Sequence, residues 1–178
     1  MTQHNHIMLD LETMGNSSNA AIVAIGAVKF DVANGITDSF YQKVDLESAV
    51  DNGGIMDPST VIWWLGQNAE ARKEMQNGGL SIMQALVQLS DWVGDEHQAR
   101  VWGNGAAFDN VILTNAYKNA GYPVFWWYWN DRCYRTIKAM YPDVPKVLPT
   151  VAHHALADAE AQARHLIAIA KAHNLELL

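Results

Sequence analysis

The sequence predicts an α/β domain with a mixed β-sheet. Three stretches that fit β-strands come first, helical stretches follow, and strand-like and helical segments then alternate. This order differs from the regular strand–helix alternation that produces a purely parallel sheet. Of the 178 residues, 49% are hydrophobic, so the chain can bury the core of a single domain spanning residues 1–178.

The first three strands are predicted at residues 7–13, 20–31 and 36–44. In the first of them, apolar side chains at every second position face one way, and Asp10 and Glu12 face the other. The second is rich in Ile, Val and Ala, which is typical of a strand buried on both faces. Because Gly35 marks a turn before the third, we expect an antiparallel meander.

Helices are predicted where a capping residue precedes apolar positions three or four residues apart. The first starts at Asp57-Pro58, since Asp is a good cap and proline fits the first turn. Trp63 and Trp64 on this helix point about 100° apart, so one can enter the core while its neighbour stays at the surface. Further helices are predicted at residues 69–76, 81–93, 108–120, 133–141 and 155–173, and further strands at residues 99–102 and 125–129.

Four acidic residues lie where chemistry could use them. Asp10 and Glu12 leave the first strand side by side, and two such carboxylates repel each other unless a cation compensates them. A divalent metal ion is the natural candidate, and a solvent-facing acidic pair is the alternative. Asp109 and Asp158 lie in the first turns of two helices, where the helix dipole alone already favours acidic residues.

Composition excludes several classes of protein. The formal charge of −7 argues against a broad basic surface that binds nucleic-acid duplexes. It does not argue against binding of one end of a nucleic-acid strand through metal ions. The single cysteine, Cys133, excludes an internal disulfide framework and a cysteine-rich zinc site. No apolar run approaches about 20 residues, and residues 1–6 are polar, so we expect no membrane segment and a cytoplasmic location. His4 and His6 resemble a metal pair, although a flexible polar terminus explains them better.

Three short motifs occur in a recognisable order: Asp10-Leu11-Glu12-Thr13, Asn-Gly-Ala-Ala-Phe-Asp at residues 104–109, and His-His-Ala-Leu-Ala-Asp at residues 153–158. They resemble the three exonuclease motifs of the DEDDh family, which includes RNase T, oligoribonuclease and polymerase proofreading domains. The resemblance extends over nearly the whole chain. The tryptophan pair between the first two motifs is similar to that of small single-domain exoribonucleases in bacteria and phages.

The resemblance implies an RNase H-like fold, a five-stranded mixed β-sheet flanked by α-helices. It also implies a 3′–5′ exonuclease that hydrolyses phosphodiester bonds at the 3′ end of single-stranded nucleic acid or 3′ overhangs and releases nucleoside 5′-monophosphates, with RNA slightly favoured. Carried over by position, the metal ligands and catalytic acidic residues are Asp10, Glu12, Asp109 and Asp158. The family's histidine stands five positions before the last aspartate, which selects His153 rather than His154 as general base. Since five positions do not share a helix face, we expect His153 on the loop before the last helix.

These residue types suit phosphodiester hydrolysis. Two Mg²⁺ ions about 3.5–4 Å apart generate the nucleophile and stabilise the leaving oxygen, and Mn²⁺ is expected to substitute. Such hard cations prefer oxygen ligands, hence four carboxylates. A histidine with a pKa of about 6.5 can take the proton of the water near neutral pH. A single histidine among carboxylates disfavours zinc.

The candidate substrate-binding residues are Thr13, Met14, Gly15, Trp63, Trp64, Asn104 and Phe108. The resemblance implies that the segment after the first motif contacts the terminal nucleotide through its backbone. Met14 could pack under a base or lie in the core, and the same alternatives apply to Phe108. Either tryptophan of the pair could stack on a base, a contact worth about 1–3 kcal/mol.

The roles of two other groups of residues stay open. The aromatic run at residues 125–129 would be apolar on both faces of a strand, so either helices or a second subunit must cover it, and we expect a homodimer. The basic residues after it either guide a phosphate backbone or only solvate a surface; they are Arg132, Arg135, Lys138 and Lys146.

Three alternatives remain. One is a nucleotide-binding module built on Gly103 and Gly105, although Phe108 stands where a dinucleotide fingerprint needs its third glycine. Another is an inactive relative that only binds single-stranded nucleic acid. The presence of suitable residues at all five catalytic positions argues against this alternative. The third is a 3′–5′ exodeoxyribonuclease in DNA repair or recombination, since the motifs do not read the sugar.

Overall fold

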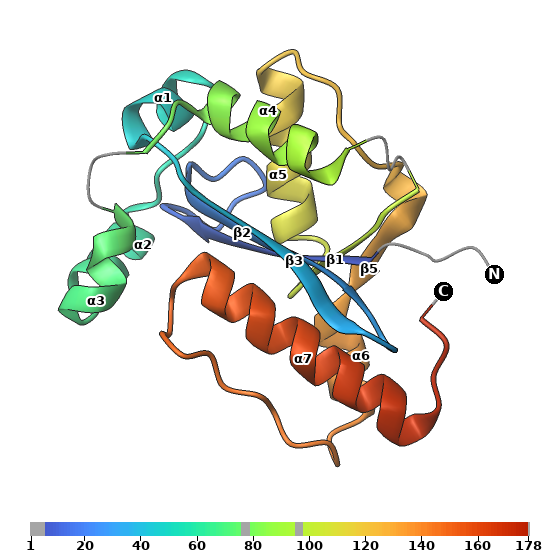
Figure 1. Ribbon diagram of the computed structural model, residues 1–178. Coiled ribbons are helices and arrows are strands. Elements are labelled where there is room, and N and C mark those ends of the chain that lie inside the picture. Colours follow the sequence, from blue (N-terminus) through green and yellow to red (C-terminus); the bar gives the residue numbers. More distant parts are fainter. Residues whose placement is uncertain (1–5, 76–78, 95–97, 178) are drawn as a thin grey trace.

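The computed structural model describes residues 6–75, 79–94 and 98–177, and its centre is a five-stranded sheet with strand order β3-β2-β1-β4-β5 (Figure 1). β1 (His6–Thr13), β2 (Ile22–Asp31) and β3 (Gly35–Lys43) form the predicted antiparallel meander. β4 (Arg100–Gly103) and β5 (Asp131–Cys133) run parallel to β1. The sheet is therefore mixed, and β1 is its central strand.

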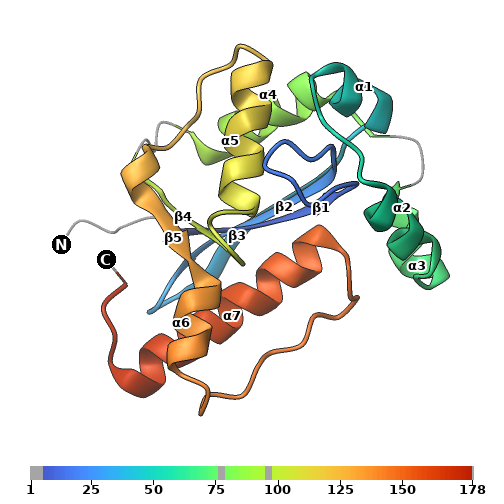
Figure 2. The same cartoon turned by 180° about the vertical axis from the view of Figure 1, so that it is seen from behind.

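Helices cover both faces of the sheet (Figures 1 and 2). α1 (Leu46–Asp51), α4 (Ile82–Val93) and α5 (Asp109–Asn119) lie on one side. α6 (Tyr134–Met140) and α7 (Ala155–His173) lie on the other. The end of the sheet where β1 exits is flanked by α2 (Pro58–Leu65), α3 (Ala69–Arg72) and the short 3₁₀ helix η1 (Lys73–Met75), whereas η2 (Tyr128–Asn130) precedes β5.

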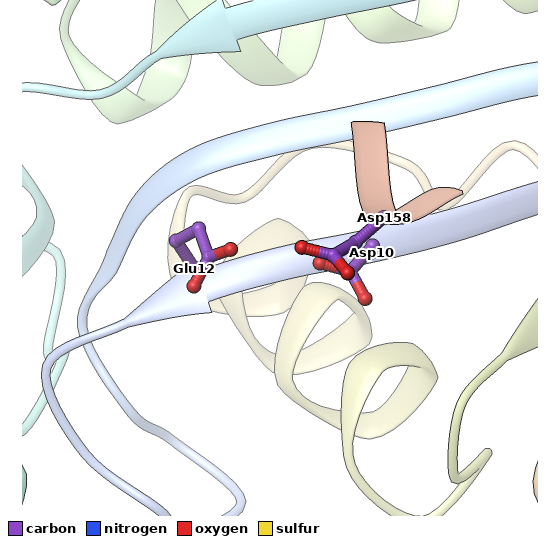
Figure 3. Close-up of side chains that lie close together, drawn as sticks. All are labelled: Asp10, Glu12 and Asp158. Atoms are coloured by element: carbon purple, nitrogen blue, oxygen red, sulfur yellow. The ribbon is translucent and has the colours of Figure 1, made fainter. Parts of the chain in front are cut away.

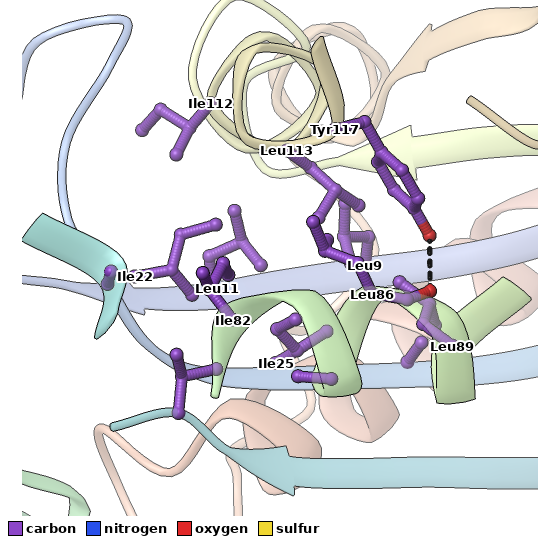
Figure 4. Close-up of a cluster of buried hydrophobic side chains, with 14 of the residues drawn as sticks. Leu9, Leu11, Ile22, Ile25, Ile82, Leu86, Leu89, Ile112, Leu113 and Tyr117 are labelled. Atoms are coloured by element: carbon purple, nitrogen blue, oxygen red, sulfur yellow. Dashed lines mark hydrogen bonds between the residues drawn. The ribbon is translucent and has the colours of Figure 1, made fainter. Parts of the chain in front are cut away.

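Two hydrophobic clusters fix the faces of β1. Ile7, Leu9 and Leu11 pack with α4 and α5, where the Tyr117 hydroxyl donates to the Leu86 carbonyl over 3.0 Å (Figure 4). Met8 belongs to the cluster on the α7 side. Because side chains alternate along a strand, Asp10 and Glu12 share the face of Met8, next to α7.

The strand predicted at residues 125–129 is wrong. Phe125 and Trp126 are buried, whereas Trp127, Tyr128 and Trp129 are exposed, so burial changes once along the run instead of alternating. The run forms a bend and then η2, and the fifth strand begins only at Asp131.

Other differences are local. The helix predicted at residues 69–76 is α3 followed by η1, and residue 76 lies outside the described residues. α1 was not predicted, and its cap Asp45 accepts a hydrogen bond from the Ser48 backbone N–H over 2.8 Å. The prediction that His6 belongs to a flexible terminus is wrong. His6 is buried in β1 and accepts a hydrogen bond from Trp102 Nε1 over 3.0 Å. His4 lies outside the described residues.

Gly26 allows α7 to begin directly on the sheet. It pairs with Asp10 across β1 and β2, and a Cβ at this position would lie 2.2 Å from the Ala155 carbonyl carbon. No L side chain fits such an approach, so the glycine brings the first turn of α7, including Asp158, against β1.

Gly26→Ala is therefore expected to lower the free energy of unfolding by about 1–3 kcal/mol, because the added methyl group overpacks the contact between α7 and β2. Urea denaturation measures the change. Gly66→Ala is the matched control, since Gly66 has a helical φ of −79° and its nearest neighbour to an added Cβ lies 3.3 Å away. Equal effects of the two substitutions would contradict the packing role of Gly26.

Candidate active site

Three carboxylates from distant parts of the chain meet at the exit of β1 (Figure 3). Asp10 and Glu12 come from β1 and Asp158 comes from the first turn of α7, and each offers an oxygen within 4.8 Å of the others. These three carboxylates meet because side chains alternate along β1 and because α7 approaches the sheet closely at Gly26. The group has the oxygen donors and the charge of a site for a divalent cation.

The three carboxylates line a cavity of about 270 Å³. The cavity brings together all five predicted catalytic residues, and five other residues complete its wall. Its lining consists of Asp10, Leu11, Glu12, Asn104, Phe108, Asp109, Arg135, His153, Asp158 and Gln162.

Asp109 enters the cavity from the first position of α5. β1 pairs with β4 only as far as Leu9 and Gly103, so the Leu11 N–H is left without a partner in β4 and donates to Asp109 Oδ1 over 3.3 Å. Asp109 Oδ2 is buried and has no hydrogen-bond partner among the described residues. This oxygen is thus available to a ligand in the cavity.

Burial disfavours the charged forms of Asp10, Asp109 and Asp158. Burial raises the pKa of Asp10 well above its usual range, and the charges of Asp109, Glu12 and Asp158 raise it further. Burial also raises the pKa of Asp109, to about 7, and the pKa of Asp158. A cation in the cavity would favour the charged form of all of them.

The residues present fit divalent cations of the Mg²⁺ or Mn²⁺ type. The donors are carboxylate oxygens, one of them (Asp109 Oδ2) is buried without a hydrogen-bond partner among the described residues, and one histidine stands nearby. Zinc would ask for more nitrogen or sulfur ligands.

The two histidines before α7 face different neighbours. His153 lies on the turn before the helix with a φ of 58°, lines the cavity and meets Trp63 edge-on with ring centroids 4.9 Å apart. His154 is the helix cap, and its ring stacks on Tyr41 at 4.6 Å. The left-handed backbone of His153 costs about 1–2 kcal/mol for a non-glycine residue, which is typical of a side chain held at a functional site.

The tryptophan pair divides as expected. Trp64 is 1% exposed and its Nε1 donates to the Thr13 carbonyl over 2.9 Å, whereas Trp63 is 44% exposed. Met14 lies in the hydrophobic core, and the Thr13 hydroxyl donates to the Gly15 carbonyl over 2.7 Å. None of these three residues of the segment 13–15 lines the cavity.

Asn104 and Phe108 do line the cavity, together with Arg135. Lys138 Nζ donates to Asn104 Oδ1 over 3.2 Å. Burial lowers the pKa of Lys138, and the nearby charges of Lys146 and Arg135 lower it further. Of the predicted basic group, Arg135 thus lines the cavity, Lys138 contacts its wall at Asn104, and Lys146 lies near Lys138.

Gln162 was missed in the sequence analysis. It stands four positions after Asp158 and so on the same face of α7, and its Nε2 donates to Asp10 Oδ1 over 2.7 Å. The spacing of four from a predicted metal ligand was the available signal.

Solved structures with low sequence identity share this fold. E. coli exonuclease I in a complex with single-stranded DNA, in its zinc-bound form, has a TM-score of 0.70 and 15% identity, over 97% of this chain and 42% of that chain. The nuclease domain of 3′hExo, a DEDDh family member bound to rAMP, has a TM-score of 0.64 and 15% identity, over 96% and 94% of the two chains. The chain therefore has the RNase H-like fold of the DEDDh exonucleases, as predicted.

The family described as the 3′–5′ exoribonuclease Rv2179c-like domain matches residues 5–170, so the chain belongs to this family of 3′–5′ exonucleases. The predicted family resemblance and hydrolase class are thereby confirmed. An exodeoxyribonuclease of Enterobacteria phage T4 is 26% identical over 122 residues, which are 61% of this chain and 53% of that protein. The chain thus spans about half the length of this curated relative.

Across residues 6–75, 79–94 and 98–177, every helix is too short or too polar to cross a membrane.

Proposed function

We propose that the protein hydrolyses phosphodiester bonds at the 3′ end of single-stranded nucleic acid or 3′ overhangs, releasing nucleoside 5′-monophosphates. The observation that carries this proposal is the convergence of Asp10, Glu12, Asp109, Asp158 and His153 on one cavity. We further propose that residues 1–178 form one exonuclease domain and that the protein is cytoplasmic, where its single thiol stays reduced.

The four carboxylates would hold two divalent cations, whose four positive charges balance their four negative charges. When bound, two Mg²⁺ or Mn²⁺ ions lower the pKa of water and stabilise charge on the attacked phosphate. His153 accepts the proton of the attacking water, and its turn before α7 keeps the imidazole at the cavity.

His153→Ala is expected to lower kcat by about 10²–10⁴-fold, the usual contribution of a general base. His154→Ala should lose much less activity, because His154 caps α7 and stacks on Tyr41 instead of lining the cavity. Single-turnover rates of both variants, with thermal unfolding as a check on the fold, measure the difference. A larger loss for His154→Ala would show that the general base was assigned to the wrong histidine.

RNA is the substrate that we propose first, because the matching family is described as exoribonucleases. The second candidate is a 3′–5′ exodeoxyribonuclease, which the similarity to the phage T4 exodeoxyribonuclease favours. Discrimination between RNA and DNA depends on whether a polar group of the protein contacts the 2′-hydroxyl of the terminal nucleotide.

One experiment tests the reaction, its polarity and the sugar together. The protein is incubated with Mg²⁺ and 5′-end-labelled single-stranded RNA, single-stranded DNA, and duplexes with 3′ overhangs. A ladder of 3′-shortened products is expected, fastest on RNA. Internal cuts, or intact substrate with both Mg²⁺ and Mn²⁺, would reject the proposed function, and a ladder on DNA alone would select the second candidate.

Several residues would hold the strand around the scissile bond. Trp63 would stack on a base, which its exposure and its contact with His153 support, and Phe108 would offer a second apolar wall. Asn104 and the neighbouring Arg135 would contact phosphate or sugar. We also retain backbone contacts from residues 13–15 to the terminal nucleotide as part of the proposal.

A homodimer is the expected assembly, because Trp127, Tyr128 and Trp129 are 52%, 78% and 57% exposed and form one aromatic patch. Light scattering at micromolar concentration should give about twice the 19.8 kDa mass of the chain. Replacement of Trp127 and Trp129 by Ser should yield monomers. A parent protein that scatters as a monomer would remove the prediction.

A further inference from the structure

Gln162 is a buried amide inside the carboxylate group. It is 8% exposed, lines the cavity, and lies one helical turn beyond Asp158 on α7. Its neighbours in the cavity include the acceptor oxygens of Asp10, Glu12 and Asp158. An amide in such surroundings can donate to a carboxylate without adding a fifth negative charge.

The two ends of the amide differ in their partners. Nε2 donates to Asp10 Oδ1 over 2.7 Å, whereas Oε1 is buried and has no hydrogen-bond partner in the part of the chain that the structure describes. A bound cation favours ionised Asp10, and this orientation is then the favourable one, because the flipped amide would set Oε1 against a carboxylate oxygen. A buried carbonyl oxygen without a donor is unfavourable in the ligand-free protein.

A ligand that carries O–H groups into the cavity would supply a donor for Oε1. The acidic lining of the cavity selects a cation, and a hydrated divalent cation carries water molecules whose O–H groups are strongly polarised. Residues that orient a metal ligand or its water in this way tune the affinity of many metal sites.

We propose that Gln162 is a positioning residue that sets the affinity of the site for divalent cations. Its Nε2 holds Asp10, and its Oε1 accepts a hydrogen bond from a water molecule of the hydration shell. The inference rests on the metal assignment of the proposed function, and it concerns binding of the cation before any substrate is present.

The test is calorimetric titration of the substrate-free protein with Mn²⁺. Gln162→Met keeps the length and bulk of the side chain but removes donor and acceptor, and it should weaken Mn²⁺ binding by about 10–100-fold. In EDTA this variant should unfold close to the parent's temperature, because loss of the hydrogen bond to Asp10 offsets removal of the buried unpaired oxygen. Lower stability in EDTA with parental Mn²⁺ affinity would indicate a merely structural role and would overturn the proposal.

Two further variants complete the design. Gln162→Asn keeps a polar amide but is one methylene too short to reach Asp10, so it should bind Mn²⁺ as weakly as Gln162→Met. Gln88→Met, an exposed substitution on α4, is the control for the chemical change and should bind like the parent. A parent that binds no Mn²⁺ would reject the proposed function itself. Parental affinity in both Gln162 variants would reject only this inference.

Discussion

Replacement of Asp10 or Asp158 by Asn is expected to abolish cleavage without unfolding the protein. Both residues supply oxygens to the carboxylate group at the exit of β1. Bound divalent ions contribute several kcal/mol to stabilisation of the transition state, so the loss should be on the order of 10³-fold or more. Asn has nearly the shape of Asp, so packing between β1 and α7 is expected to survive.

Single-turnover cleavage of end-labelled RNA with saturating Mg²⁺ measures this effect, and circular dichroism checks the fold. Asp51→Asn is the matched control, because Asp51 is exposed on α1 and lies outside the cavity. It removes the same charge and should leave the rate unchanged. Normal turnover by either Asp10→Asn or Asp158→Asn would contradict the two-metal assignment.

The central strand and the site could be predicted because their signals are local. Alternation along residues 7–13 is sufficient to place Asp10 and Glu12 on one face, and the resemblance of residues 104–109 and 153–158 to the DEDDh motifs adds Asp109 and Asp158. What the pattern could not supply is the contact that joins them. Asp158 reaches Asp10 because Gly26 leaves no side chain between α7 and the sheet, and the sequence marks that position only as a glycine within a strand.

The fifth strand was misplaced because contacts between distant residues determine where it begins. Asp131 Oδ1 accepts hydrogen bonds from Trp126 Nε1 and from Asn110 Nδ2, both over 2.8 Å. Asn110 also donates to the Val101 carbonyl, so this network fixes the fifth strand against β4 and α5 at Asp131. Aromatic residues favour strands in general, and this preference misplaced the strand at residues 125–129.

Gln162 was missed for a different reason. A glutamine on a helix is common and carries no charge, so its spacing of four from Asp158 is a weak signal by itself. Only the hydrogen bond to Asp10, 152 positions away in the sequence, shows that it belongs to the site.

The metal-free protein is expected to lose stability as the pH rises from 5 to 8. The pKa of Asp109 is about 7 in the folded state and about 3.9 in an unfolded chain, so between these values the folded state binds more protons. The free energy of unfolding then falls with increasing pH, and this fall ends above the folded pKa. For Asp109 alone the full difference is worth roughly 4 kcal/mol, and the raised pKa of Asp10 acts in the same direction.

Urea denaturation in EDTA at pH 5, 6, 7 and 8 measures this dependence. Asp109→Asn should be more stable than the parent at pH 8 and should show a shallower pH dependence, whereas Asp51→Asn should follow the parent. Stability of the parent that rises between pH 5 and 8, or an Asp109→Asn variant that is less stable at pH 8, would contradict the prediction.

Addition of Mn²⁺ should reverse the trend, because a cation competes with protons for the same carboxylates and binds more tightly as they ionise. The loaded protein should then gain stability over the pH range in which the metal-free protein loses it. Such a crossover would show that binding of the cation relieves the cost of keeping ionised carboxylates in a buried cavity. It would also explain why a chain with a net charge of −7 retains four acidic residues around one cavity.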